Sequence, residues 1–163
     1  MRKAFTIIAI LSFFVYLFVL FRLLLFRYAM PFSQVLENMR LPRYPSSYNL
    51  IPFRTIIGYV KMLTEGNVDG SLNRYIPIWN IIGNIIILMP LGFYLPFLIK
   101  KMAILKNFAI TVSGMIISIE LLQFIFRVGS LDIDDFILNL VGALISFVIF
   151  THRPASLLLK LRT

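Results

Sequence analysis

Four long, almost uncharged apolar stretches constrain this chain more than any other feature of its sequence. They cover about residues 4–26, 76–99, 107–126 and 133–150. A helix needs about 20 mostly apolar residues to cross the roughly 30 Å hydrocarbon core of a bilayer, and each stretch is close to that length. Charged residues make up only 14% of the chain, against about 25% in soluble domains. The sequence therefore predicts an all-α, polytopic membrane protein with about four transmembrane helices in a single domain over residues 1–163.

The first stretch follows Arg2 and Lys3, as the apolar core of a signal peptide would. Such a core runs only about 7 to 15 residues, whereas this stretch is longer and no Ala-x-Ala cleavage site follows it. We therefore expect an uncleaved span. In the second stretch Pro90 predicts a kink, because proline interrupts the hydrogen bonds of a helix. Gly114-xxx-Ser118 and Gly142-xxx-Ser146 are small-xxx-small patterns that allow close helix packing.

Basic residues predict the orientation of the spans. An even number of spans puts three basic regions on one side of the membrane, and by the positive-inside rule that side is the cytoplasm. These regions contain Arg2 and Lys3; Lys100, Lys101 and Lys106; and Arg153, Lys160 and Arg162. We therefore expect a multi-pass protein of the cell membrane with both termini cytoplasmic. Basic residues that flank the spans and contact anionic membrane lipids account for the net charge of +9. Membrane lipids are therefore the expected partners, and nucleic acid is not.

The outer loop, residues 27–75, contains one periodic segment. Pro52 can occupy the first turn of a helix, where its missing N–H has no partner to lose. Apolar residues then recur on one helical face, at Phe53, Ile56, Ile57, Val60 and Leu63. This spacing predicts an amphipathic helix that is interfacial or partly re-entrant; the alternative is an irregular loop packed on the bundle.

Polar residues recur at helical spacing on three of the spans. Counted from the outer end of each span at a rise of about 1.5 Å per residue, all of these residues lie in the outer part of the membrane. Their matched depths predict one cavity that opens to the outer face. In that cavity Arg127 would pair with Asp132 or Asp135. The candidate binding residues are Asn84, Glu120, Gln123, Arg127, Asp132, Asp135 and Asn139, with Arg54 on the amphipathic segment; Asn80 shares the stripe of Asn84, and Gly142 that of Asn139.

Ionisable groups at membrane depth usually face a bundle interior or a watery cavity, so a functional site is the first hypothesis. The alternative is an interhelical network that only fixes the packing. Acidic oxygens suit Mg²⁺ or Ca²⁺, but Asp132-Ile133-Asp134-Asp135 lacks an EF-hand loop, and the chain has no Cys. We predict neither a metal site nor a cofactor. The single histidine, His152, is expected on the cytoplasmic side, too far away for a Ser/His/Asp site.

Several short motifs follow one another between about residues 49 and 142. They are Asn49-Leu50-Ile51-Pro52-Phe53; Asn84 with Pro90-Leu91-Gly92-Phe93; Ser118-x-Glu120-x-x-Gln123; and Arg127 with Asp132-Ile133-Asp134-Asp135, Asn139 and Gly142. The ordered set resembles the VanZ family, small membrane proteins associated with resistance to teicoplanin, a lipoglycopeptide antibiotic that binds cell-wall precursors outside the membrane. The resemblance implies a bacterial cell-membrane protein that affects glycopeptide susceptibility. It carries over no catalytic residues.

Three hypotheses of function follow. The favoured one is non-enzymatic: the outer pocket and the amphipathic segment bind a membrane lipid headgroup, the lipoglycopeptide or a cell-wall lipid precursor, and a basic rim of Arg54, Lys61 and Arg74 attracts anionic headgroups. The alternative is an enzyme acting on a lipid-linked or phosphorylated envelope substrate. In it Glu120 would be the general acid or base, while Asp132 and Asp135 hold a divalent cation. Transport or proton relay ranks third, because the polar stripes do not continue to the cytoplasmic side.

Overall fold

A computed structural model describes residues 2–25, 32–40, 48–65 and 75–152. In these ranges four helical segments are long and apolar enough to span a membrane: Lys3–Leu24, Tyr75–Leu98, Leu105–Phe126 and Ile133–Thr151. The prediction of an all-α, polytopic membrane protein is confirmed. The spanning elements are α1 (Arg2–Leu25), α4 (Tyr75–Ile87) continued by α5 (Leu91–Leu98), α6 (Leu105–Phe126) and α7 (Ile133–Thr151).

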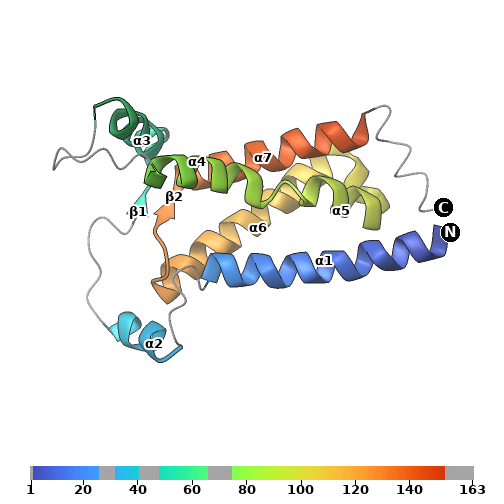
Figure 1. The fold of residues 1–163 in the computed structure, drawn as a ribbon, viewed down its shortest axis with the longest axis horizontal. Helices are drawn as coiled ribbons and strands as arrows, with labels where there is room; N and C mark the ends of the chain where they lie inside the picture. Colours follow the sequence, from blue (N-terminus) through green and yellow to red (C-terminus); the bar gives the residue numbers. More distant parts are fainter. Residues whose placement is uncertain (1, 26–31, 41–47, 66–74, 153–163) are drawn as a thin grey trace.

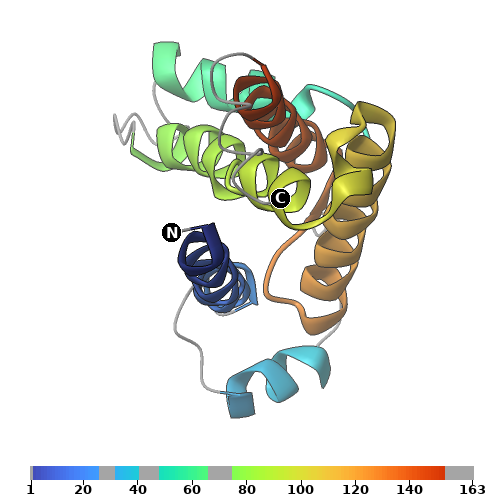
Figure 2. The same cartoon turned by 90° about the vertical axis from the view of Figure 1, so that its right-hand side faces the viewer.

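Helix α7 is the most central of these elements, because it packs against α4, α5 and α6. Helix α1 lies beside α5 and α6, and viewed end-on it stands to one side of the other spans (Figure 2). The start of α1 and the end of α7 lie at the same end of the bundle (Figure 1). The short elements α3, β1 and β2 gather at the opposite end, which we call the α3 end.

The second span is broken at the predicted position. Helix α4 ends at Ile87 and α5 begins at Leu91, with turn residues between them. Across the break the hydrogen bonds become tighter: the Leu91 N–H donates to the Leu88 carbonyl at 3.1 Å and the Gly92 N–H to the Met89 carbonyl at 3.0 Å. Pro90 has no N–H to continue the regular ladder, so the kink expected from the sequence is confirmed.

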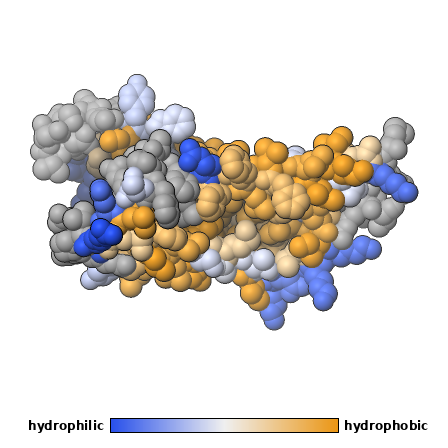
Figure 3. Space-filling model, turned by 90° about the horizontal axis from the view of Figure 1, so that it is seen from below, coloured by the Kyte–Doolittle hydropathy of each residue, from blue (hydrophilic) through white to orange (hydrophobic). Residues whose placement is uncertain are grey.

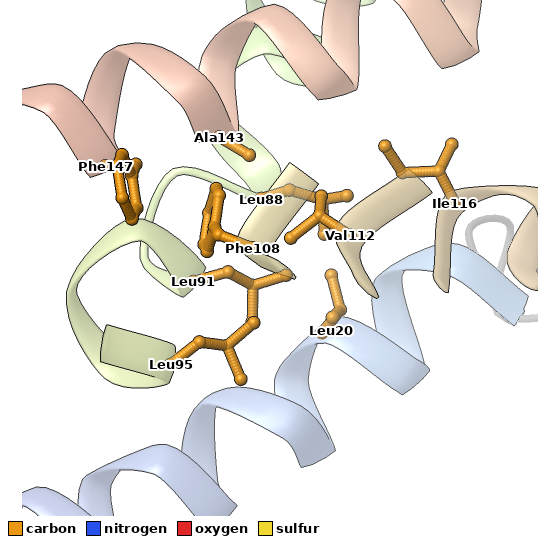
Figure 4. Packing of buried hydrophobic residues seen from close by; sticks show 9 residues of the cluster. All are labelled: Leu20, Leu88, Leu91, Leu95, Phe108, Val112, Ile116, Ala143 and Phe147. Carbon is orange, nitrogen blue, oxygen red and sulfur yellow. The ribbon is translucent and has the colours of Figure 1, made fainter. Parts of the chain in front are cut away.

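An apolar core joins all four spans at mid-bundle. The rings of Phe108 and Phe147 stack with centroids 4.6 Å apart, and Leu20 brings α1 into the same cluster (Figure 4). Close approach of α4 and α7 depends on Gly142, because a Cβ there would overlap the Ile85 carbonyl. The full cluster comprises Leu20, Leu88, Leu91, Leu95, Phe108, Val112, Ile116, Ala143 and Phe147.

Large apolar side chains are also abundant on the outside. On the face in Figure 3 they form a band along the bundle, with hydrophilic residues mainly toward its two ends. Helix α1 contributes strongly, for example with Phe14 and Phe18 at 64% and 67% exposure. A water-soluble monomer rarely exposes so much contiguous apolar surface. A belt of side chains that faces lipid requires such a surface.

The outer loop contains more structure than the sequence predicted. Helix α3 (Arg54–Glu65) confirms the amphipathic helix after Pro52. Helix α2 (Phe32–Arg40) and the two-residue strands β1 (Tyr48–Asn49) and β2 (Leu131–Asp132) were not predicted. The strands are parallel, with Tyr48 opposite Leu131 and Asn49 opposite Asp132. A short 3-10 helix, η2 (Lys100–Ala103), joins α5 to α6. The basic residues Arg74, Arg153, Lys160 and Arg162 lie outside the described ranges.

Candidate functional site

Asp134 attaches helix α3 to the membrane bundle. Its side chain is fully buried and accepts three backbone hydrogen bonds from the start of α3: Phe53 N–H to Oδ1 at 2.5 Å, and Thr55 and Ile56 N–H to Oδ2 at 2.7 and 3.1 Å. The first N–H groups of a helix have no partners within the helix and carry partial positive charge. One carboxylate therefore satisfies these donors and fixes where α3 begins.

The strand pair adds a second attachment beside the first. Thr55 donates its hydroxyl to Asp132 Oδ2 at 2.6 Å, and Asn49 Nδ2 donates to Asp132 Oδ1 at 3.0 Å and to the Thr55 hydroxyl oxygen at 3.0 Å. Asp132 also caps α7, because its Oδ1 accepts the Asp134 N–H at 2.9 Å. The two motifs that are most distant in the chain, at Asn49–Phe53 and Asp132–Asp135, thus form one hydrogen-bonded unit.

Phe53 has an unusual backbone conformation at this junction. Its φ is 65°, in the left-handed region that non-glycine residues seldom adopt. It follows Pro52, and the Arg54 N–H closes the turn on the Ile51 carbonyl at 3.4 Å. Proline followed by a residue with positive φ is the pattern of a type II turn. This turn points the Phe53 N–H at Asp134, so the strained residue serves the attachment.

A cavity of about 440 Å³ lies at the α3 end of the bundle. Side chains from α1, α3, α4, α6 and α7 line it together with the connection between α6 and β2. Tyr59 is the lining residue that comes from α3, so the attached helix borders the cavity directly. Its polar lining residues include Asn80, Asn84, Glu120, Gln123, Ser130, Asp132, Asp135 and Asn139.

Glu120 is the buried acid of α6, with 5% of its surface exposed. Its Oε2 accepts the Asp132 N–H at 3.2 Å, which links α6 to β2. Within the described part of the chain, no hydrogen bond reaches its other oxygen. Asn139 on α7 is similarly buried at 6%; its Nδ2 donates to the Asp135 carbonyl at 2.7 Å.

Further polar contacts hold the walls together. Asn84 of α4 donates its amide N–H to Asp135 Oδ1 of α7, and Gln123 Nε2 of α6 donates to the Leu24 carbonyl of α1 at 2.8 Å. These contacts are the interhelical network considered from the sequence. The hydrogen bonds of this network leave the cavity open, so the residues that fix the packing also line a space that could hold a ligand.

Six of the candidate residues line the cavity together, and two do not. Helix α6 ends at Phe126, and Arg127 adopts a left-handed conformation with φ 55°. The helical face shared by Glu120 and Gln123 therefore ends before Arg127, and Arg127 is not among the lining residues. Arg54 is exposed at the start of α3, also outside the lining. The proposed ion pair of Arg127 stays a prediction. The six are Asn84, Glu120, Gln123, Asp132, Asp135 and Asn139.

Sequence reasoning missed the role of Asp134 because helical spacing put it on a different face from Asp135. Its partners are backbone N–H groups about 80 residues earlier, which side-chain periodicity cannot reveal. The described ranges contain no group of three or more acidic, His or Cys side chains arranged to hold a metal ion. Both oxygens of Asp132 and of Asp134 already accept hydrogen bonds from the protein.

Four apolar spans with a polar cavity at one end define an all-α polytopic membrane protein with a candidate binding site. The VanZ/LLP1 family matches residues 13–158, and the chain belongs to this family. Over 69 residues the chain is 36% identical to "Protein VanZ" of Enterococcus faecium. That segment covers 42% of this chain and 42% of the relative, so less than half of the relative's length is matched. No solved structure matches this chain.

Proposed function

We propose that this protein acts in the bacterial cell envelope to lower susceptibility to lipoglycopeptide antibiotics such as teicoplanin. In this proposal it lies in the cell membrane with the α3 end outside, and the cavity there binds a lipid headgroup or the antibiotic. The observation that carries the proposal is the cavity itself, with six candidate residues from three spans in its wall. The family resemblance supplies the class of antibiotic.

The size and place of the cavity support a binding role. Small-molecule sites usually enclose about 300–1,000 Å³, and this cavity of about 440 Å³ has room for a headgroup or a comparable part of a larger ligand. Polar groups in a membrane bundle usually mark a substrate or ligand path, since leaving them in lipid is unfavourable. A site that only fixed the packing would not need this space.

Helix α3 supplies a basic surface next to the site. Arg54 and Lys61 are exposed on α3, while Tyr59 of the same helix lines the cavity. Basic side chains at a membrane surface attract anionic headgroups, at about 1 kcal/mol each. In the proposed orientation these residues gather anionic lipid or lipid-linked precursor at the outer surface, and the buried attachment through Asp134 keeps α3 at the cavity.

A susceptibility panel tests this function. Cells lacking the gene, cells expressing the wild-type chain and cells expressing Asp135→Asn are compared for growth in lipidated and non-lipidated glycopeptides. We expect the wild-type chain to raise the inhibitory concentration of the lipidated compounds selectively and Asp135→Asn to lose that effect at equal membrane abundance. Unchanged susceptibility on deletion, or an equal change for lipidated and non-lipidated compounds, would refute the proposal.

A further inference from the structure

The cavity at the α3 end is rich in hydrogen-bond acceptors and poor in cations. Three acids line it, namely Glu120, Asp132 and Asp135, and no Lys, Arg or His is found among its described lining residues. A ligand with a negative group deep in this space would meet carboxyl oxygens and no cationic side chain among the described lining residues. The lining therefore favours a ligand that brings positive charge and N–H donors.

Two buried acceptor atoms support this reading independently of the charge count. Glu120 and Asn139 are 5% and 6% exposed and both line the cavity. Among the described residues, hydrogen bonds reach only Oε2 of Glu120 and involve only Nδ2 of Asn139. Their other oxygens, Oε1 and Oδ1, have no donor in this part of the chain. Buried acceptors normally have a partner, and a bound donor in the cavity would supply it.

Another part of the wall is apolar. Leu23 and Leu24 from the last turn of α1 and Ile87 and Leu88 at the end of α4 line the cavity, with Ile119 from α6. A soluble amine would gain nothing from these side chains, whereas a lipid brings apolar carbon next to its headgroup. Burial of apolar area is favourable at roughly 25 cal/mol per Å², so the two kinds of wall fit the two parts of one amphipathic molecule.

We propose that the cavity binds the primary ammonium group of an aminolipid headgroup, of the phosphatidylethanolamine type. The ammonium donates N–H groups to Glu120 Oε1 and Asn139 Oδ1, and the adjoining lipid carbons contact Leu23 and Leu24. A primary ammonium has three donors; a quaternary ammonium keeps the charge but has none. This inference rests on the proposed function of the cavity and specifies its ligand.

The test compares headgroups on the purified full-length protein in detergent. Short-chain phosphatidylethanolamine, its mono- and dimethylated forms, phosphatidylcholine and phosphatidylglycerol are titrated, and Kd is measured for each. We expect affinity to fall with each methylation and by about tenfold or more at phosphatidylcholine, since hydrogen bonds to charged groups are the strong ones. Equal affinity for phosphatidylethanolamine and phosphatidylcholine overturns the proposal. So does a preference for phosphatidylglycerol.

Variants and a soluble probe complete the test. Glu120→Gln should reduce phosphatidylethanolamine affinity about tenfold, Asn139→Leu should also reduce it, and exposed Glu65→Gln should leave it unchanged. If both cavity variants keep the wild-type headgroup selectivity, Glu120 and Asn139 do not bind the ammonium group. The soluble headgroup analogue O-phosphoethanolamine should bind more weakly than the lipid, and equally tight binding would show that the ligand need not be a lipid. The binding assay contains no antibiotic, so it tests the ligand separately from the proposed function. If the protein shows no headgroup selectivity but still lowers susceptibility in cells, the aminolipid proposal is refuted and the proposed function is not.

Discussion

At the residue scale, Asp134 attaches the outer segment to the membrane bundle. It is fully buried, and its three backbone donors belong to the turn and first residues of α3. The nearby Asp132 is joined to Asn49 and Thr55. Two neighbouring acids in one chain segment therefore hold the outer segment, while the next acid, Asp135, faces the cavity. Asp132 does both, because it also lines the cavity.

Asp134→Asn tests the attachment. The amide replaces one acceptor oxygen with an NH₂ group that faces backbone N–H donors, so at least one buried donor loses its partner. We expect the free energy of unfolding, measured by denaturant titration in detergent, to fall by about 3 kcal/mol. The exposed Glu65→Gln makes the same chemical change and should alter it by less than about 0.5 kcal/mol. Equal effects of the two substitutions would show that Asp134 does not hold α3.

The candidate site was predictable where regular helices carry it. Glu120 and Gln123 on α6, Asp135 and Asn139 on α7, and Asn84 on α4 come together because helical spacing puts polar side chains on inward faces. Helical spacing could not place Arg127, because the spacing rule holds only while the helix continues. The end of α6 at Phe126 has no glycine to mark it in the sequence.

At the element scale, the spans and α3 follow from local patterns, whereas the remaining elements do not. Hydropathy fixes each span within a few residues, and α3 shows a regular apolar face after Pro52. Helix α2 is short, and the sequence around it is rich in proline, which favours a loop reading. The pairing of β1 with β2 joins residues more than 80 positions apart over only two residues each, too little for any periodicity to appear.

Gly142→Ala tests the packing of α4 against α7. The added Cβ would overlap the Ile85 carbonyl, so the helices must separate, at a cost of about 1–3 kcal/mol typical of overpacking. The matched control is Gly114→Ala, whose Cβ would meet nothing within 4 Å and which should be neutral or slightly stabilising through helix propensity. Thermal unfolding in detergent distinguishes them. A Gly142→Ala protein as stable as Gly114→Ala would contradict the observed contact.

At the scale of the whole molecule, the two ends of the bundle differ in kind. One end has the start of α1, the lysines of η2 and the end of α7; the other has the cavity, the attached helix α3 and the strand pair. In the proposed orientation the first end is cytoplasmic, as the positive-inside rule predicts. The cavity would then face the side where glycopeptides and cell-wall precursors meet.

The absence of native cysteines makes this orientation testable with single substitutions. Ser130 and Lys101 are exposed and lie beyond opposite ends of α6. In intact cells a membrane-impermeant thiol reagent should label Ser130→Cys, whereas Lys101→Cys should be labelled only after permeabilisation. The reverse pattern would put the cavity in the cytoplasm and would remove the proposed access to antibiotic.

The most direct measurement of the central claim is the amount of fluorescent teicoplanin bound to cells that express the protein. We expect the wild-type chain to lower surface-bound antibiotic, Glu120→Gln to restore binding to the level of cells without the protein, and Glu65→Gln to behave as wild type, with all three present in the membrane in equal amounts. Glu120→Gln reducing antibiotic binding as fully as the wild-type chain would contradict the claim that the cavity at the α3 end carries the function.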